Sequence, residues 1–201
     1  MLQSRLRGPV SLLITPICRA LLRVGLRANH LTVIGALGSS ACAIYFFSRG
    51  EFFTGTLLVT LFLLTDLLDG TMARLVSENG TRWGAFLDST VDRIADAALL
   101  LGIFAYISSG EPKVESGLSE LVLLLTLVMS FLVSYVRARA ESLGIPCAVG
   151  VGERTERLVI LLIGTGLFGL GVSAALEVSI WIVLAISTIT VIQRIVLVAR
   201  T

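Results

Sequence analysis

Long apolar stretches follow one another along almost the whole of this 201-residue chain, and they limit what it can fold into. A transmembrane helix needs about 20 mostly apolar residues. The composition agrees, since 55% of the residues are hydrophobic and the mean hydropathy is +0.93, far above that of a soluble domain. We expect a single-domain, all-α integral membrane protein with six spans, at residues 31–48, 53–73, 85–108, 118–136, 158–176 and 178–195.

The first 28 residues do not resemble a usual signal peptide. Arginines interrupt their apolar residues, and no small-residue cleavage site follows. We expect segment 9–25 to form an amphipathic helix in the plane of the membrane interface, with its arginines toward lipid phosphates. The single domain, 1–201, would then consist of an interfacial helix within 1–28 and a six-helix bundle in 29–201.

Basic residues are unevenly distributed among the predicted connections. If the N-terminus is cytoplasmic, the outer turns contain only Arg49 and Lys113 as cations, and nearly all other arginines are on the inner side. The positive-inside rule therefore predicts a multi-pass cell-membrane protein with both termini in the cytoplasm. We expect membrane lipid, and no nucleic acid, as a partner.

Five aspartates interrupt the second and third predicted spans, and one of them, Asp96, could pair with Arg93 or with an arginine of another span. Asp66 and Asp69 are three residues apart, and Asp88 and Asp92 are four apart, so each pair lies on one face of its helix. A charged side chain inside a span costs about 2.5–3.5 kcal/mol. Adjacent antiparallel spans would bring both pairs together near the cytoplasmic surface. Because carboxylate oxygens suit hard divalent cations, we expect a site for two Mg²⁺ or Mn²⁺ ions.

The residues around these aspartates leave room for an anionic ligand. Gly70 and Gly84 stand inside predicted helices, where glycine costs about 1 kcal/mol relative to alanine, which indicates close approach of a ligand or a neighbouring backbone. Arg74 can meet a phosphate, and Ala73 keeps that face open. His30 is the only histidine, which excludes a histidine-based site, and the three scattered cysteines show no zinc pattern.

The pattern of these residues resembles the signature of the CDP-alcohol phosphotransferase family. Members transfer a phosphatidyl group from a CDP-linked lipid, usually CDP-diacylglycerol, to an alcohol and release CMP. The resemblance implies that Asp92 is the general base and also contacts metal, beside the three other aspartates. It implies a homodimer as well. The matching residues read Asp66-x2-Asp69-Gly70-x2-Ala73-Arg74-x9-Gly84-x3-Asp88-x3-Asp92.

The same resemblance implies a pocket for the nucleotide and diphosphate of CDP-diacylglycerol. The stretch "RANHLT" resembles a family element near the nucleotide, and it can equally be a helix entry with Asn29 as the capping residue. The predicted donor-binding residues are Asn29, Thr32, Gly70, Ala73, Arg74, Thr81 and Gly84.

Two stretches near the cytoplasmic ends of later spans bear on the acceptor. "SYVRARAE" and "ERTERL" resemble the actinobacterial phosphatidylinositol phosphate synthases within this family, whose acceptor is inositol 1-phosphate. The planar guanidinium group suits phosphate recognition. For Arg139 and Arg200 we prefer anchoring to anionic headgroups. The predicted acceptor-phosphate residues are Arg137, Arg154, Arg157 and Arg194.

Two alternatives remain at this point. Glycerol 3-phosphate also carries a phosphate, so the same chemistry could make phosphatidylglycerophosphate. A divalent-cation transporter would also need clustered carboxylates. Against the transporter, the predicted cluster lies at the cytoplasmic end of the spans, whereas transport sites usually lie near the bilayer midplane.

Overall fold

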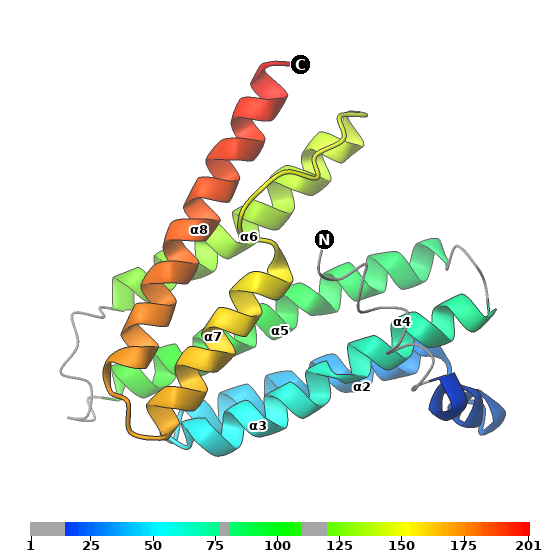
Figure 1. Cartoon of the computed structure of the whole chain (residues 1–201), viewed down its shortest axis with the longest axis horizontal. Helices are drawn as coiled ribbons and strands as arrows, with labels where there is room; N and C mark the ends of the chain where they lie inside the picture. The colour runs from blue at the N-terminus through cyan, green and yellow to red at the C-terminus, as the bar shows by residue number, and fades with distance from the viewer. Residues whose placement is uncertain (1–14, 77–80, 110–119) are drawn as a thin grey trace. The chain divides into compact units, whose positions relative to one another are not determined.

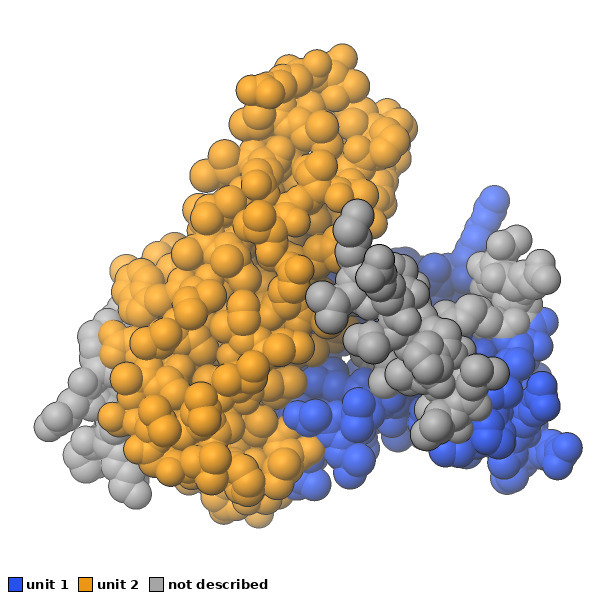
Figure 2. All heavy atoms as spheres, in the orientation of Figure 1, with its two compact units in different colours: residues 1–42, 58–96 blue, residues 43–57, 97–201 orange. Residues whose placement is uncertain are grey.

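The computed structural model describes residues 15–76, 81–109 and 120–201, without the side chains of Asp66, Leu67 and Arg74. These residues form helices and turns and contain no strand, which confirms the predicted all-α class (Figure 1). The chain divides into two compact units (Figure 2). Unit 1 comprises residues 1–42 and 58–96, and unit 2 comprises 43–57 and 97–201.

Unit 1 is built on the packing of α2 (Ala28–Cys42) against α4 (Thr65–Val76). A preceding helix at residues 15–23 adds Cys18 to a buried cluster with Leu31 and Met72. Part of the predicted segment 9–25 is therefore helical, residues 9–14 lie outside the described ones, and its place in the membrane interface stays a prediction. The helix at the start of "RANHLT" begins at Ala28, so Asn29 lies in the first turn and is not the cap.

The predicted second span consists of two helices, α3 (Phe52–Leu63) and α4, separated at Leu64. At this break the Thr65 hydroxyl donates to the Phe62 carbonyl oxygen over 2.6 Å, a local side-chain bond that competes with regular helix. Gly35 of α2 packs here, because a Cβ on it would collide with Thr65 Oγ1. Absence of a side chain on Gly35 thus allows α2 to approach the start of the aspartate-bearing helix.

Unit 2 contains α6 (Glu120–Ser142), α7 (Arg154–Gly169) and α8 (Ala174–Ala199), and α8 packs against both of the others. The π-helix η1 (Ala43–Phe47) continues α2. On α6 the hydroxyls of Thr126 and Ser130 are buried, whereas Leu121 and Leu124 are exposed. Small polar side chains inside and large apolar ones outside are what a helix facing lipid requires.

Within residues 15–76, 81–109 and 120–201, four stretches are long and apolar enough to cross a membrane: Ala28–Phe47, Phe52–Ala73, Glu120–Ser142 and Ala174–Ala199. The chain is a multi-pass membrane protein, and the six predicted spans are matched only in part. The third, α5 (Arg82–Ser108), is long but carries several charges in its first half. The predicted bounds of the fifth, 158–176, are wrong because α7 ends at Gly169 and a turn with Gly171 at φ +96° precedes α8.

Gly164 of α7 lies at the contact with α8, whereas Gly166 of the same helix has more room around it. A Cβ on Gly164 would collide with the Ser179 side chain and stand 3.0 Å from the Ala175 carbonyl oxygen, whereas one on Gly166 would be 3.5 Å from Thr56 Cγ2. We expect Gly164→Ala to lower the free energy of unfolding by about 1–3 kcal/mol through overpacking. Gly166→Ala, the matched control, should be neutral or stabilising by up to about 1 kcal/mol. Thermal unfolding in detergent measures both, and equal midpoints would contradict the close contact.

Candidate functional site

The Asp69 carboxylate is the most buried of the described motif aspartates, with 6% of its residue surface exposed. Thr32 of α2 reaches it across the α2–α4 contact, and the Thr32 hydroxyl donates to Asp69 Oδ2 over 2.5 Å. The same hydroxyl has the Ala28 carbonyl oxygen, 3.1 Å away, as a second and more distant acceptor. Two residues 37 positions apart, both predicted from the motif pattern, therefore meet in the interior of unit 1.

The start of α5 brings three further predicted donor residues together. Thr81 caps this helix, since its Oγ1 accepts the Gly84 N–H over 3.0 Å. A Cβ on Gly84 would stand 3.1 Å from Thr81 Oγ1 and 3.3 Å from Asn29 Oδ1. Glycine at position 84 therefore allows the first turn of α2 to lie against the first turn of α5. Asn29 and Thr32, one turn apart on α2, contact two different parts of the motif.

Asp88 and Asp92 lie one turn apart on α5, as their spacing predicts, with Asp88 exposed and Asp92 half-buried. Arg93 lies between two carboxylates, with its Nη2 3.7 Å from Asp92 Oδ2 and 3.7 Å from Asp96 Oδ2. The pairing of Arg93 with Asp96 is the one that three-residue spacing suggests. Its contact with Asp92 escapes sequence reasoning, because adjacent residues on a helix do not normally face each other.

The donor set suits a hard cation, because every predicted ligand offers carboxylate oxygen. Among the described side chains no three carboxylate, thiol or imidazole groups stand together as a metal site. The side chain of Asp66 lies outside the described ones, as does that of Arg74, so the four-carboxylate site stays a prediction. Gly70 and Ala73 are half-buried on α4, beside Asp69 and one turn after it.

Two of the predicted acceptor arginines are buried in unit 2. Arg194 of α8 donates through Nε to the Val149 carbonyl oxygen over 2.8 Å and through Nη1 to that of Val133. Arg157 of α7 donates through Nη1 to the Gly152 carbonyl oxygen over 2.6 Å. Both guanidinium groups therefore hold backbone in place. Because arginine has five donors, a further contact with a ligand is compatible with this geometry.

The other two predicted acceptor arginines lie on either side of the α6–α7 connection. Arg137, near the end of α6, is exposed and pairs with Glu141, with Nε 2.9 Å from Oε1. Arg154 is the first residue of α7 and is half-buried. Unit 2 thus gathers Arg137, Arg154, Arg157 and Arg194 around one connection, although their binding role stays a prediction.

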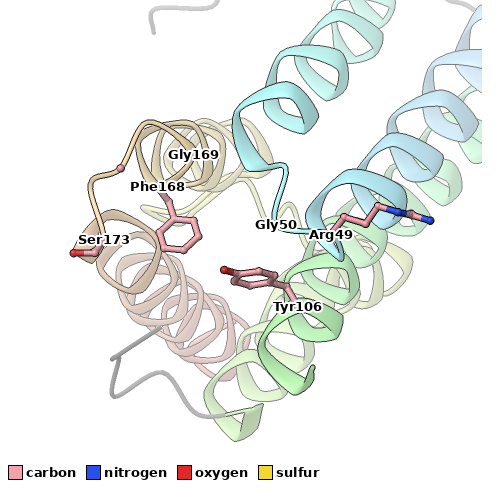
Figure 3. A pocket seen from close by; sticks show the side chains of 7 residues that line it. Arg49, Gly50, Tyr106, Phe168, Gly169 and Ser173 are labelled. Atoms are coloured by element: carbon pink, nitrogen blue, oxygen red, sulfur yellow. The ribbon is translucent and has the colours of Figure 1, made fainter. Parts of the chain in front are cut away.

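A pocket of about 520 Å³ in unit 2 contains none of the predicted site residues. Figure 3 shows Tyr106 and Phe168 turning their rings toward it, and Arg49 pointing away. The Arg49 guanidinium lies 3.7 Å from the Tyr45 ring centroid and donates to the Tyr45 carbonyl oxygen over 3.1 Å. This cation is already engaged outside the pocket, so we do not assign the predicted chemistry there.

Comparison with known proteins agrees with the motif. A model of the CDP-alcohol phosphatidyltransferase family matches residues 26–197. The phosphatidylinositol phosphate synthase of Streptomyces avermitilis is 42% identical over 208 residues, covering 100% of this chain and 83% of that protein. The fold is similar to crystal structures of the Mycobacterium tuberculosis phosphatidylinositol phosphate synthase in complex with manganese and citrate (TM-score 0.83) and with CDP-DAG bound (TM-score 0.82). Both are 40% identical and match 92% of this chain, covering 88% and 92% of theirs.

The contact between Thr32 and Asp69 can be tested by changing only the hydroxyl. Thr32→Val keeps the side-chain shape and removes one donor from a buried carboxylate, so we expect the free energy of unfolding to fall by about 1–3 kcal/mol. Thr32→Ser is the matched control, because it keeps the hydroxyl and should lose much less. Thermal unfolding of both variants in detergent measures the difference. Equal losses would mean that the hydrogen bond contributes nothing.

Proposed function

Because this chain belongs to the CDP-alcohol phosphatidyltransferase family, we propose that it transfers the phosphatidyl group of CDP-diacylglycerol to inositol 1-phosphate. The products are phosphatidylinositol phosphate and CMP. The observation that carries the proposal is the meeting of three distant motif segments in unit 1, where α2 contacts Asp69 through Thr32 and lies against Gly84 through Asn29. Likeness to phosphatidylinositol phosphate synthases over the whole chain supports the choice of acceptor over glycerol 3-phosphate.

The donor site lies in unit 1. Two Mg²⁺ or Mn²⁺ ions, held by Asp66, Asp69, Asp88 and Asp92, would neutralise the donor diphosphate and stabilise the departing CMP oxygen. The manganese in the solved relative supports this cofactor. The Thr32 hydroxyl holds the Asp69 carboxylate in position, and Gly84 lets Thr81 and Asn29 lie close to the first turn of α5. We assign the donor pocket to Asn29, Thr32, Gly70, Ala73, Arg74, Thr81 and Gly84.

Asp92 is the proposed general base. It accepts the proton of the acceptor hydroxyl while that oxygen attacks the phosphatidyl phosphorus, and the bond from phosphorus to the CMP oxygen breaks. Arg93 lies 3.7 Å from the Asp92 carboxylate and helps to orient it. The other carboxylate beside Arg93, that of Asp96, lies outside the motif.

The acceptor phosphate is the proposed ligand of Arg137, Arg154, Arg157 and Arg194. The support is their gathering around the α6–α7 connection and the forked geometry of guanidinium groups. Free inositol offers these cations no phosphate to bind. The acceptor is therefore selected by charge as well as by shape.

The proposed arrangement in the membrane has six spans, with α5 and α7 joining the four most apolar stretches. The N-terminal amphipathic helix lies in the interface, and the active site and both termini face the cytoplasm. Support comes from the bias of arginine toward the inner connections. We also propose a homodimer, in line with the family resemblance.

CMP release tests the reaction and the acceptor together. The purified full chain in detergent, with CDP-diacylglycerol and Mg²⁺, is expected to release CMP with inositol 1-phosphate and not with free inositol or glycerol 3-phosphate. Chelation with EDTA should abolish the release, and added Mg²⁺ or Mn²⁺ should restore it. Release with glycerol 3-phosphate alone would contradict the assignment of inositol 1-phosphate as acceptor. Absence of release with all three compounds would contradict the proposed transferase activity.

The substitution Asp92→Asn tests the role of Asp92 as a general base separately from metal binding. The rate of CMP release is expected to fall by about 10²–10⁴-fold, the usual contribution of a general base. Mn²⁺ binding, measured by electron paramagnetic resonance, should persist because three aspartates remain. Asp96→Asn is the matched control, since it removes the other carboxylate beside Arg93 and should keep most of the rate. Similar rates in the two variants would argue against Asp92 as the base.

A further inference from the structure

The connection between α6 and α7, residues 143–153, runs back along α6 before α7 begins (Figure 1). It is held at two points by side chains of α8. Arg194 Nε donates to the Val149 carbonyl oxygen over 2.8 Å, and the Gly152 N–H donates to Thr190 Oγ1 over 2.9 Å. These bonds satisfy backbone groups that have no partner in a regular helix.

Both backbone polar groups of Gly152, its N–H and its carbonyl oxygen, are hydrogen-bonded. Thr190 accepts from its N–H, and Arg157 Nη1 donates to its carbonyl oxygen over 2.6 Å. Gly152 is buried, and Thr190 is 0% exposed. The Thr190 hydroxyl uses its own proton on the Ile186 carbonyl oxygen over 2.7 Å. Its lone pair is therefore what binds the Gly152 N–H, and valine could not replace it.

Two glycines let the connection lie directly on α8. Gly150 has φ +136°, a backbone conformation that residues with a side chain rarely adopt. A Cβ on Gly150 would also collide with Thr190 Cγ2. A Cβ on Gly152 would stand 3.1 Å from the Ile186 carbonyl oxygen. Contact with α8 thus depends on both glycines as well as on the threonine hydroxyl.

This contact acts on the start of α7. Only Glu153 separates Gly152 from Arg154, and the Glu153 N–H is itself held by Glu156 Oε2 over 3.0 Å. Holding the Gly152 peptide on α8 therefore fixes the first turn of α7, which carries both Arg154 and Arg157. Of the predicted acceptor arginines, this anchor therefore positions Arg154 and Arg157.

We propose that Thr190 is a positioning residue for acceptor binding: its bond to the Gly152 N–H sets the first turn of α7 so that Arg154 meets the acceptor phosphate. The inference rests on the proposed function. It concerns a residue outside the motif and outside the predicted arginine set. The donor site in unit 1 has no part in it, so the KM for CDP-diacylglycerol should not depend on Thr190.

Thr190→Val removes the hydroxyl and keeps the shape. We expect the KM for inositol 1-phosphate to rise about tenfold, with the KM for CDP-diacylglycerol changed less than about twofold. Thr190→Ser should restore the wild-type KM. Thr188→Val is the matched control, because Thr188 has the same intrahelical bond, to the Leu184 carbonyl oxygen, and no described hydrogen bond to the connection. Hydrogen–deuterium exchange of residues 145–153 should accelerate in Thr190→Val and not in Thr188→Val.

The inference is overturned if both KM values rise equally, if kcat alone falls, or if Thr190→Val matches Thr188→Val. Should Thr190→Val not fold, Gly150→Ala takes its place, and a folded Gly150→Ala with wild-type KM for the acceptor would overturn the inference. If the wild-type protein uses glycerol 3-phosphate and not inositol 1-phosphate, the proposed acceptor is wrong. The KM for glycerol 3-phosphate then tests the positioning role, because that acceptor also presents a phosphate.

Discussion

The burial of one charged group, Asp69, constrains how the first half of the chain can pack. A carboxylate on an apolar helix must find hydrogen-bond donors or positive charge. Thr32 supplies one donor, which requires the first turns of α2 to lie beside the middle of α4. Asn29, one turn earlier, is thereby brought to Gly84 at the start of α5. Because the buried Asp69 carboxylate needs hydrogen-bond donors, three segments of the motif are thus brought together.

The second half solves the opposite problem, that of buried cations. Arg157 and Arg194 are 4% and 2% exposed, and the carbonyl oxygens of Gly152, Val149 and Val133 accept from them. Two of these carbonyl groups, those of Val149 and Gly152, come from the irregular connection, and that of Val133 belongs to α6. The guanidinium groups and the connection therefore depend on each other, because a buried cation requires hydrogen-bond acceptors.

Periodic and averaged properties of the sequence were sufficient for the helical class and, among the described residues, for four of the six predicted span positions. They could not reveal the break at Leu64, because hydropathy averages over a window in which Thr65 counts as one mildly polar residue. The early end of α7 was missed for a similar reason, since the turn residues Leu170 and Val172 are apolar. Of the two partners that the sequence left open for Asp96, the structure places Arg93 beside it, at three-residue spacing. Long-range contacts such as Arg194 with Val149, 45 residues away, leave no periodic trace.

The shortness of α7 has a consequence for the surrounding lipid. Its 16 residues rise about 24 Å, whereas the hydrocarbon core of a typical bilayer is about 30 Å thick. As the fifth crossing, α7 would create a hydrophobic mismatch of about 6 Å, and a mismatch of this sign is relieved by local thinning of the bilayer. Headgroups would then dip toward the α6–α7 connection. In that arrangement, the stability of this region would depend on the thickness of the membrane as well as on the contacts within the protein.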